Sequence, residues 1–436
     1  MTEDTALLLI YLIPLLLICG GYLYVRQRRE RANRTLFEAA TAGGLHEPAS
    51  LHPVIDISRC MGCGACVSAC PEHNVLGMLE GKAQLVGPAN CIGHGACQKS
   101  CPFGAIELVF GTASRGVDIP LLSPDFQTSK SGIFIAGELG GMGLIRNAIE
   151  QGSQAMAAMI NALPKQHDRE LDVVIVGAGP AGLAAGLAAK AAGIRFLILD
   201  QEHTLGGTVA HFPRGKLVMT QPAELPLAGK MKLTETSKEN LLDFWNRTLE
   251  RYPLPIRFGE RVQSIEQDGD GYRVSTAQQH YQARLVLLAI GRRGSPRTLN
   301  IPGEQSDKVV YRLVDPEQYR GQSVMVIGGG DSALEAAISI AEEPGTQVSL
   351  SYRGEGFSRA KAKNRDRLQA LQKAGQLQVF LNSEPATIEQ DAVLLKTPGG
   401  LQSIPNDSVI ICAGGELPTG FLKKIGIQVE TKYGTA

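Results

Sequence analysis

Cysteine spacing is the strongest chemical signal in this chain. Seven of the nine cysteines lie between Cys60 and Cys101, in two runs of the form C-x2-C-x2-C-x3-C-P, with a histidine in place of one cysteine in the second run. The candidate ligands are Cys60, Cys63, Cys66, Cys70, Cys91, His94, Cys97 and Cys101. Thiolates at this spacing wrap an iron–sulfur cubane, whereas zinc usually binds two separated cysteine pairs. The clustering predicts iron–sulfur ligation in a reducing compartment rather than disulfides.

A glycine-rich turn between two apolar runs is the second chemical signal. The run Val173–Val176 leads into G-x-G-x-x-G, and the run Phe196–Leu199 ends in an acid. The residues singled out are Gly177, Gly179, Pro180, Ala181, Gly182 and Asp200. The glycines permit a tight turn, close approach of a pyrophosphate and close helix packing, and the acid suits a ribose hydroxyl. The pattern predicts a dinucleotide site; the alternative is a glycine-rich turn in another α/β domain.

A second motif of this kind begins after Val324. The strand pattern there is followed by G-x-G-x-x-A, with the residues Gly328, Gly330, Asp331, Ser332 and Ala333. The next apolar run, 347–351, ends in Tyr352-Arg353 instead of an acid. Arginine suits a phosphate on the ribose, so Arg353 favours NADPH over NADH. The alternative for Arg353 is a solvent-facing strand end.

The two cysteine runs resemble bacterial two-cluster ferredoxins from Val54 to Val109. The resemblance implies one 4Fe-4S cluster on Cys60, Cys63, Cys66 and Cys101, and a second cluster on Cys70, Cys91 and Cys97. His94 departs from the family pattern, because it stands where a cysteine is expected. A 4Fe-4S cluster with imidazole as fourth ligand and a 3Fe-4S cluster both remain open, with the cubane slightly favoured.

The nucleotide motifs resemble thioredoxin reductase-like flavoproteins, with FAD in the first fold and NAD(P)H in the second. In that family a G-[ED] pair meets the ribityl chain and an R-x-A lies near the isoalloxazine ring. The resemblance implies further cofactor-binding residues at Gly137, Glu138, Arg146, Ala148, Gly207, Gly291 and Arg359. No cysteine occurs from Tyr311 to Met325, where thioredoxin reductases carry C-x-x-C. The chain therefore looks more like ferredoxin–NADP reductases, which also lack that pair.

The order of the segments differs from that family. The flavin-closing segment comes last there but precedes the first nucleotide fold here, which predicts a circular permutation with the C-terminus close to residues 111–125. The segments that we expect are a transmembrane anchor at 6–25, a linker at 26–50, a ferredoxin domain at 51–110, the closing segment at 111–165, an FAD domain at 170–303, an NAD(P)H domain at 304–411 and a return to the FAD domain at 412–436. For residues 211–231, a solvated loop and a docking or substrate-facing surface both remain open.

The N-terminal run from Ala6 to Val25 contains no charged residue and is followed by five arginines. A helix of this length spans roughly 30 Å, and the charge asymmetry predicts a single-pass anchor in the inner membrane, with the N-terminus outside and the catalytic domains in the cytoplasm. Lysine plus arginine and aspartate plus glutamate both number 43, so nothing indicates a nucleic-acid partner. A homodimer remains open.

Together these features predict an α/β protein with two Rossmann-like three-layer domains, a small α+β two-cluster ferredoxin domain and one transmembrane helix. A nicotinamide gives up two electrons as a hydride and a cluster accepts one, and a flavin can join the two chemistries. We therefore expect an NAD(P)H oxidoreductase whose redox partner is a quinone, a cytochrome, a ferredoxin or a small thiol compound. The alternative is a redox sensor or assembly module that binds the cofactors without rapid turnover.

Overall fold

The computed structural model describes most of the chain. The described residues are 3–42, 48, 51–72, 74–91, 93, 95–113, 116–141, 143–164, 169–212, 214–215, 217–219, 223–231, 235–292, 294–357 and 360–434. They form two compact units, Met1–Val117 with Lys432–Ala436, and Asp118–Thr431.

The first unit contains a small α+β fold with an internal repeat. Two antiparallel strand pairs frame the cysteine runs: β1 (His52–Ile55) with β4 (Ile106–Val109), and β2 (Leu76–Leu79) with β3 (Lys82–Leu85). Each run feeds a short helix, α2 (Ala65–Ala69) or α3 (Ala96–Lys99), and η1 (Pro88–Asn90) precedes the second run. The residues before the two helices, Gly64 and Gly95, both have a left-handed backbone, which glycine adopts without steric cost. The sequence repeat is therefore also a backbone repeat.

The segment predicted as a linker at 26–50 is helical as far as Ala42. It forms the second half of α1 (Glu3–Ala42), and residues 26–42 contain no proline or glycine that would interrupt the helix. α1 packs on β2 of the cysteine-rich fold, with Asn33 half-buried and Ala40 buried. This stretch is therefore a docked helix rather than a polar linker.

The prediction of a single-pass anchor is wrong. No helix in the described part of the chain is both long enough and apolar enough to cross a membrane. The inner-membrane localisation, which depended on this anchor, is not supported.

The second unit contains a large sheet with the strand order β13-β8-β7-β16-β15-β14, in which β6 also pairs with β16. The first four strands of this order and β6 run parallel, as expected for a nucleotide-binding sheet. The strands are β6 (Ile133–Ile135), β7 (Leu171–Val176), β8 (Phe196–Leu199), β13 (Ile256–Arg257), β14 (Ser264–Asp268), β15 (Gly271–Ser275) and β16 (His280–Leu288).

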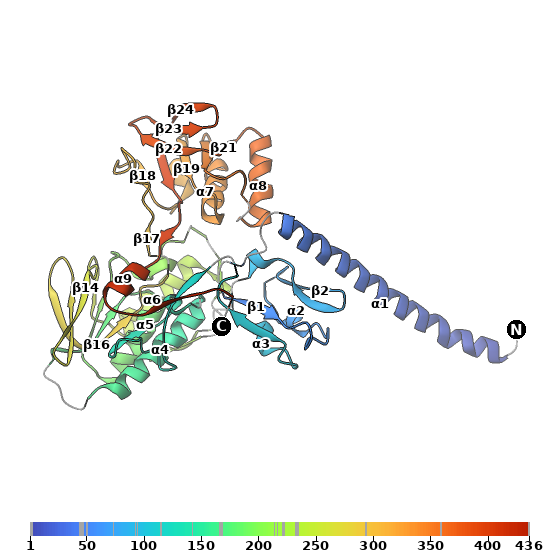
Figure 1. The fold of residues 1–436 in the computed structure, drawn as a ribbon, viewed down its shortest axis with the longest axis horizontal. Helices are drawn as coiled ribbons and strands as arrows, with labels where there is room; N and C mark the ends of the chain where they lie inside the picture. Colours follow the sequence, from blue (N-terminus) through green and yellow to red (C-terminus); the bar gives the residue numbers. More distant parts are fainter. Residues whose placement is uncertain are drawn as a thin grey trace. The chain divides into compact units, whose positions relative to one another are not determined.

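Helices cover both faces of this sheet (Figure 1). α4 (Ile145–Ala162), α5 (Pro180–Ala192) and α6 (Lys238–Arg251) pack on the face that carries Val173 and Ile175. The next residues of β7, Val174 and Val176, point to the opposite face, which α9 (Thr419–Lys424) covers. Alternation along a strand places successive side chains in two separate cores, so the strand is buried on both faces.

The C-terminal strand lies beside the segment that follows the cysteine-rich fold. β27 (Val429–Lys432) pairs with β5 (Val117–Pro120), and the Thr431 hydroxyl donates to the Asp118 carboxylate at 2.7 Å. The backbone N–H of Gly434 donates to the carbonyl of Phe110 at 2.8 Å. The chain therefore ends close to residues 110–120.

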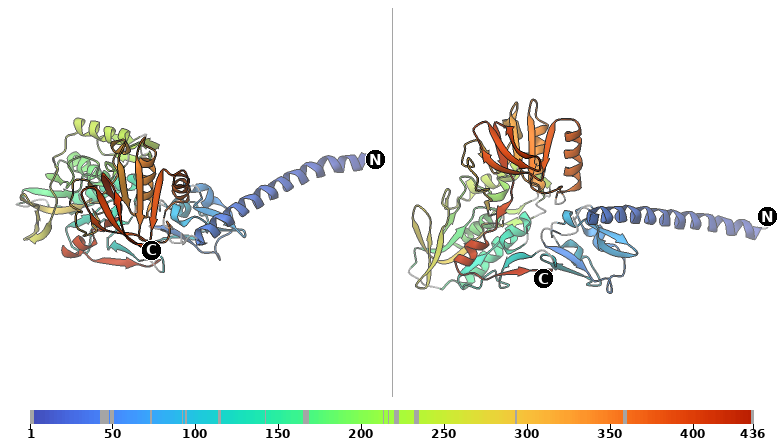
Figure 2. Two further views of the ribbon diagram at one scale, coloured as in Figure 1. Left: turned by 90° about the horizontal axis from the view of Figure 1, so that it is seen from above. Right: turned by 45° about the horizontal axis from the view of Figure 1, so that its top comes forward.

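A second parallel sheet has the order β18-β25-β19-β20-β21. It carries two helices and a three-stranded antiparallel sheet, seen in orange and red from two sides in Figure 2. The elements are β18 (Val309–Val310), β19 (Ser323–Ile327), α7 (Asp331–Ala341), β20 (Gln347–Tyr352), α8 (Ala362–Lys373), β21 (Leu377–Leu381), β22 (Glu384–Ile388), β23 (Ala392–Thr397), β24 (Gly400–Pro405) and β25 (Ser408–Ile411).

The remaining elements are short. They are η2 (Glu138–Gly140), η3 (Gly207–Val209), β9 (Leu217–Met219), β10 (Ala223–Leu225), β11 (Gly229–Met231), β12 (Glu235–Ser237), β17 (Ser295–Pro296), η4 (Pro316–Tyr319) and β26 (Gly415–Glu416). Val218, Leu225 and Met231 are buried in the core under α6. The described part of segment 211–231 therefore contributes buried side chains to this core and is not a wholly solvated loop.

Candidate functional site

The predicted flavin-contacting residues follow the carboxyl ends of four parallel strands. Ile135, Leu288, Val176 and Leu199 lie in one row across β6, β16, β7 and β8. Because the four strands end at the same level, the loops after them meet at one edge of the sheet, where ligands bind in open α/β folds. The residues that follow these strands include Gly137, Glu138, Gly291, Gly177 and Asp200.

The space around each glycine of the first motif is as a dinucleotide-binding loop requires. A Cβ on Gly177 would stand 2.4 Å from the carbonyl oxygen of Ala289, and one on Gly182 would stand 1.8 Å from the carbonyl oxygen of Gly177. A Cβ on Gly179, in contrast, would meet nothing within 4 Å. The outer glycines therefore allow close packing, and the middle one leaves the backbone open to a ligand, as a pyrophosphate requires. Pro180 and Ala181 begin α5 directly beneath this loop.

The predicted flavin-closing segment packs against this same loop. A Cβ on Gly137 would lie 3.0 Å from the Ala181 methyl and 3.7 Å from the Ala148 methyl. The N–H of Gly137 donates to the Gln151 amide oxygen on α4 at 2.9 Å. α4 and α5 approach closely, because a Cβ on Gly152 would stand 2.1 Å from the carbonyl oxygen of Ala181. The structure therefore places Gly137 and Ala148 beside the first glycine motif, although they precede Gly177 by 40 and 29 positions in the sequence.

Two charged residues of the closing segment, Glu138 and Arg146, are half-buried. Glu138 is half-buried, and its carboxylate Oε1 lies 3.2 Å from the Cβ position of Gly143. Arg146 is half-buried on the first turn of α4 and pairs with Glu150 at 2.9 Å. Gly207 contacts the middle glycine, since its Cβ would lie 3.2 Å from the Gly179 Cα.

Asp200 holds the glycine loop in place. This carboxylate is 6% exposed and accepts hydrogen bonds from the backbone N–H groups of Ala178 and Glu202. Burial raises the pKa of Asp200, and the two N–H donors oppose that rise. The side chain therefore sits at the predicted position after β8 and also fixes the turn between Gly177 and Gly179.

The second glycine motif repeats the spatial pattern. A Cβ on Gly328 would stand 2.4 Å from the carbonyl oxygen of Cys412, whereas one on Gly330 would meet nothing within 4 Å. Ala333 is fully buried against Gly328, and Ser332 accepts a weak hydrogen bond from the Cys412 thiol through its carbonyl. Asp331 accepts from the Lys361 N–H at 2.9 Å and from the Asn364 amide at 2.7 Å. Asp331 thereby joins α7 to the start of α8.

Two aromatic rings follow β20 near this motif. Tyr352 stacks on Phe357 with 5.4 Å between ring centroids, and a Cβ on Gly329 would stand 2.2 Å from the Tyr352 ring. Arg353 is exposed at the end of the strand. Arg359 lies outside the described residues. The position predicted for ribose recognition therefore carries an exposed guanidinium beside a stacked aromatic pair.

The first cysteine set converges as the ferredoxin resemblance implies. Cys60, Cys63, Cys66 and Cys101 line one small cavity, together with apolar side chains such as Phe103. In the described part of the chain, no three His, Cys, Asp or Glu side chains come close enough to hold a single metal ion. Four cysteine thiolates around one cavity are the ligand set that a 4Fe-4S cluster requires.

The second set is described only in part, because His94 lies outside the described residues. Cys70, Cys91 and Cys97 lie near one another, because the Cys70 thiolate raises the pKa of Cys91 and the Cys70 and Cys91 thiolates raise the pKa of Cys97. Burial raises the pKa of Cys66 and of Cys97 to about 11, and backbone N–H groups that face the sulfur atoms oppose this rise. A bound iron cluster would supply the positive charge that keeps such buried groups deprotonated.

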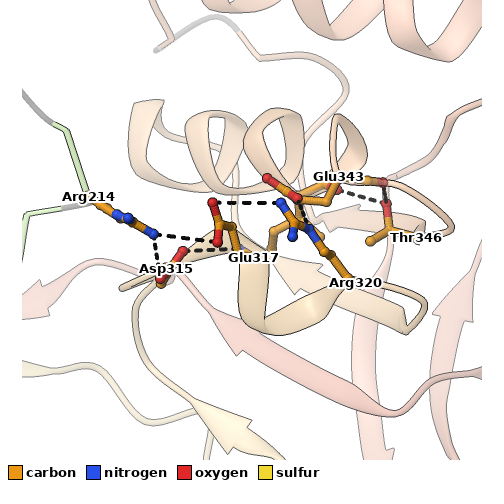
Figure 3. A network of polar contacts seen from close by, with 7 residues as sticks. Arg214, Asp315, Glu317, Arg320, Glu343 and Thr346 are labelled. Atoms are coloured by element: carbon orange, nitrogen blue, oxygen red, sulfur yellow. Dashed lines mark hydrogen bonds and ion pairs between the residues drawn. The ribbon is translucent and has the colours of Figure 1, made fainter.

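One connection between the two nucleotide folds was not predicted from the sequence. Lys238 and Glu239 at the start of α6 anchor the loop 211–215 through the Phe212 carbonyl at 2.6 Å and the Gly215 N–H at 3.1 Å. From that loop, Arg214 reaches Asp315 and Glu317 in the second fold, each at 3.5 Å (Figure 3). These residues carry no motif, and only opposite charges far apart in the sequence could have suggested the contact.

A histidine beside the Asp200 loop was also missed. His211 Nε2 lies 3.0 Å from the Glu202 carboxylate, and burial is the main cause that lowers the pKa of His211. Its place four residues after Gly207 is the only sequence signal that could have indicated it.

The fold and its two glycine motifs define a class of protein. Residues 174–435 match the family model described as pyridine nucleotide-disulphide oxidoreductase, which covers more than half of the chain. The chain therefore belongs to the pyridine nucleotide-disulphide oxidoreductase family. Residues 52–102 match the model described as 4Fe-4S dicluster domain.

Individual relatives indicate which members of this family the chain is similar to. The chain is 30% identical over 271 residues to a ferredoxin–NADP reductase from Ignicoccus hospitalis, a match that covers 60% of this chain and 83% of the relative. It is 28% identical over 271 residues to a ferredoxin–NADP reductase from Thermus thermophilus, with 59% and 77% covered. Its fold is similar to that of the bacillithiol disulfide reductase from Staphylococcus aureus, at a TM-score of 0.50 and 24% identity over 60% of this chain and 81% of that one.

These matches settle the broad activity. The protein is an FAD-dependent oxidoreductase with a 4Fe-4S domain, similar to ferredoxin–NADP reductases, and NADP(H) is the nicotinamide cofactor that the family supports. A second cluster is implied by the dicluster description alone.

Proposed function

We propose that this protein transfers electrons between NADPH and an external carrier through an FAD and two iron–sulfur clusters held by the same chain. The observation that carries the proposal is the fusion of two dinucleotide loops with a cavity lined by four cysteines. One hydride delivers two electrons, and two clusters that each accept one electron match that number. The chain lacks a C-x-x-C pair before its second glycine motif, so a protein dithiol does not take part.

The proposed FAD site uses the loops after β6, β7, β8 and β16. Gly179 leaves its backbone open for the pyrophosphate, and Asp200 suits the adenosine ribose. Gly137 and Glu138 would contact the ribityl chain, with Arg146 and Ala148 nearer the ring system. When bound, FAD supplies the chemistry that joins hydride transfer to single-electron transfer.

We further propose that the FAD domain is circularly permuted. Two observations support this: the closing segment packs on Ala181 at the first glycine motif, and the chain end pairs with β5 near the start of that segment. Chain ends that lie close together make such a rearrangement physically tolerable. An FAD-bound structure with Glu138 more than about two hydrogen-bond lengths from the ribityl chain would contradict this assignment.

The remaining finer assignments are also proposals. Arg353 and Arg359 would recognise the 2′-phosphate, which favours NADPH over NADH. Cys60, Cys63, Cys66 and Cys101 would hold the first cluster, and Cys70, Cys91 and Cys97 would hold the second with or without His94. The external carrier is a quinone, a cytochrome, a ferredoxin or a small thiol compound.

Steady-state NADPH oxidation with an artificial one-electron acceptor tests the proposal. We expect turnover that requires bound FAD, and the natural carrier can then be identified by adding candidates one at a time. A protein that binds FAD but cannot have it reduced by NADPH would refute the proposal and favour a non-catalytic redox module.

A further inference from the structure

The second half of α1 contacts the β2–β3 hairpin through three polar side chains. The Asn33 amide donates to the carbonyl of Met78 at 3.2 Å, and Glu30 accepts from the N–H of Glu80 at 3.0 Å. The Arg34 guanidinium pairs with the Glu80 carboxylate at 3.2 Å. Residues 30, 33 and 34 share one helix face, because side chains three and four positions apart are neighbours.

Asn33 fits against the hairpin without a gap. A Cβ on Gly77 would stand 2.7 Å from the Asn33 Cγ, so only the absence of a side chain at residue 77 admits the amide. The contact is therefore specific to this pair of residues and is not a general feature of a helix lying on a strand.

The other side of the same hairpin supports the loop of the first cysteine set. A Cβ on Gly62 would stand 2.0 Å from the carbonyl oxygen of Gly81, so the two backbones touch. The Met78 side chain lies 3.8 Å from the Cβ position of Gly62 and 4.0 Å from that of Gly64. The Lys82 ammonium donates to the carbonyl of Cys60 at 2.5 Å. The hairpin thus lies between α1 and the Cys60–Cys66 loop.

The second cysteine run has different supports in the described residues. A Cβ on Gly93 would stand 2.6 Å from the carbonyl oxygen of Leu51, and one on Gly95 would stand 3.1 Å from the Leu108 side chain. Neither Gly93 nor Gly95 has these close contacts with the hairpin residues that α1 contacts. An effect transmitted from α1 should therefore reach the two clusters unequally.

We propose that Glu30, Asn33 and Arg34 are positioning residues for the first iron–sulfur cluster. They hold the hairpin against the Cys60–Cys66 loop and so limit the access of water to that cluster. Solvent exposure is one of the factors that set the reduction potential of such clusters. The inference rests on the proposed ligand set Cys60, Cys63, Cys66 and Cys101.

Two substitutions test this in the full chain with its clusters in place. Asn33→Ala removes the amide, and Gly77→Ala adds a methyl group that displaces it. The readouts are the paramagnetic resonance spectrum and the midpoint potential of each cluster, with Cys63→Ser used to identify the signal of the first cluster. Thr35→Ala is the matched control, because Thr35 is exposed, bonds only within α1 to the carbonyl of Arg31 at 3.1 Å, and faces away from the hairpin by helical spacing.

We expect both substitutions to change the spectrum of the first cluster and to shift its potential to more positive values, because water stabilises the more highly charged reduced form. The second cluster and the Thr35→Ala protein should be unchanged. First-cluster signals that stay unaltered in both variants, or equal shifts in both clusters, would overturn the inference. If the unmodified protein shows no iron–sulfur signal, the proposed ligand set itself fails, which is a distinguishable result.

Discussion

At the scale of single residues, Asp200 combines a proposed contact with the ligand and a structural role in the glycine loop, and the sequence pattern does not distinguish the two roles. Its position after β8 suits a ribose hydroxyl, and its carboxylate also binds the N–H groups of Ala178 and Glu202. Loss of such an acceptor leaves buried donors unsatisfied, at a cost of about 1–3 kcal/mol.

We therefore predict that Asp200→Ala loses both FAD and stability. FAD content per chain should fall, and the free energy of unfolding of the FAD-free protein should fall by about 1–3 kcal/mol. Absorbance after purification and denaturant unfolding measure the two effects. A variant that keeps full stability while losing FAD would show that Asp200 acts on the ligand alone.

Arg353 allows a direct test of nicotinamide choice. Because its exposed guanidinium would pair with the 2′-phosphate, Arg353→Ala should raise the KM for NADPH about tenfold or more and leave the KM for NADH nearly unchanged. Steady-state kinetics with both nucleotides checks this. Equal changes for the two nucleotides would assign Arg353 a different role.

His94 decides the type of the second cluster. If the imidazole is a ligand, His94→Cys should lower the potential of that cluster, because a thiolate replaces a neutral donor. His94→Ala should then change the paramagnetic signal of the second cluster. A signal typical of three irons in the oxidised protein, unaltered in His94→Ala, would show that the imidazole is not a ligand.

At the scale of elements, the Arg214 contact joins the loop 211–215 to η4. Both partners are partly exposed, and such pairs usually contribute about 0.2–1 kcal/mol. Arg367 offers a matched control, because it pairs with Glu342 at 2.6 Å inside the second nucleotide fold and not with Asp315 or Glu317.

We predict that Arg214→Ala changes the rate at which NADPH reduces FAD by no more than about fivefold, and that it reduces the dependence of this rate on salt. Arg367→Ala should leave both unchanged. Rapid-mixing absorbance measurements at low and high ionic strength distinguish the variants. An Arg214→Ala protein with unaltered rate and salt dependence would mean that the contact has no part in positioning the domains.

The elements that could be predicted were those whose sequence pattern is local. The strand–glycine–helix units at Gly177 and Gly328 and the repeated cysteine runs combine short spacings with apolar periodicity, and the structure shows these elements where expected. The docking of α1 could not be predicted, because Asn33 and Gly77 carry no local signal and meet only in the fold. The apolar run before Val25 predicted a membrane anchor, but no helix in the described part of the chain is long and apolar enough to cross a membrane.

At the scale of the whole molecule, the order of segments could be inferred only by comparing the positions of motifs. The proposed flavin-closing segment precedes the first nucleotide fold, and nothing in the local sequence around Gly137 indicates which strand it will join. The structure pairs β6 with β16, more than 140 residues later. A pattern within a short stretch of sequence cannot predict a strand pairing over such a distance.

The permutation proposal predicts how rearranged chains behave. Deletion of residues 111–165 should abolish FAD binding, because Gly137 and Ala148 no longer pack on the first glycine motif. A rearranged chain, in which residues 111–165 are moved to follow Ala436, should bind FAD again. FAD retention on gel filtration measures both, and a deletion variant that keeps FAD would show that the closing segment belongs to no flavin site.

The central claim is that electrons pass between NADPH and the clusters through FAD within one chain. An anaerobic titration of the purified protein with continuously regenerated NADPH tests it, with flavin absorbance and cluster paramagnetic resonance followed in the same samples and no other carrier present. We predict that flavin bleaching is accompanied by the reduced-state signal of at least the cluster of higher potential. Complete bleaching of the flavin while both clusters remain oxidised would contradict the account.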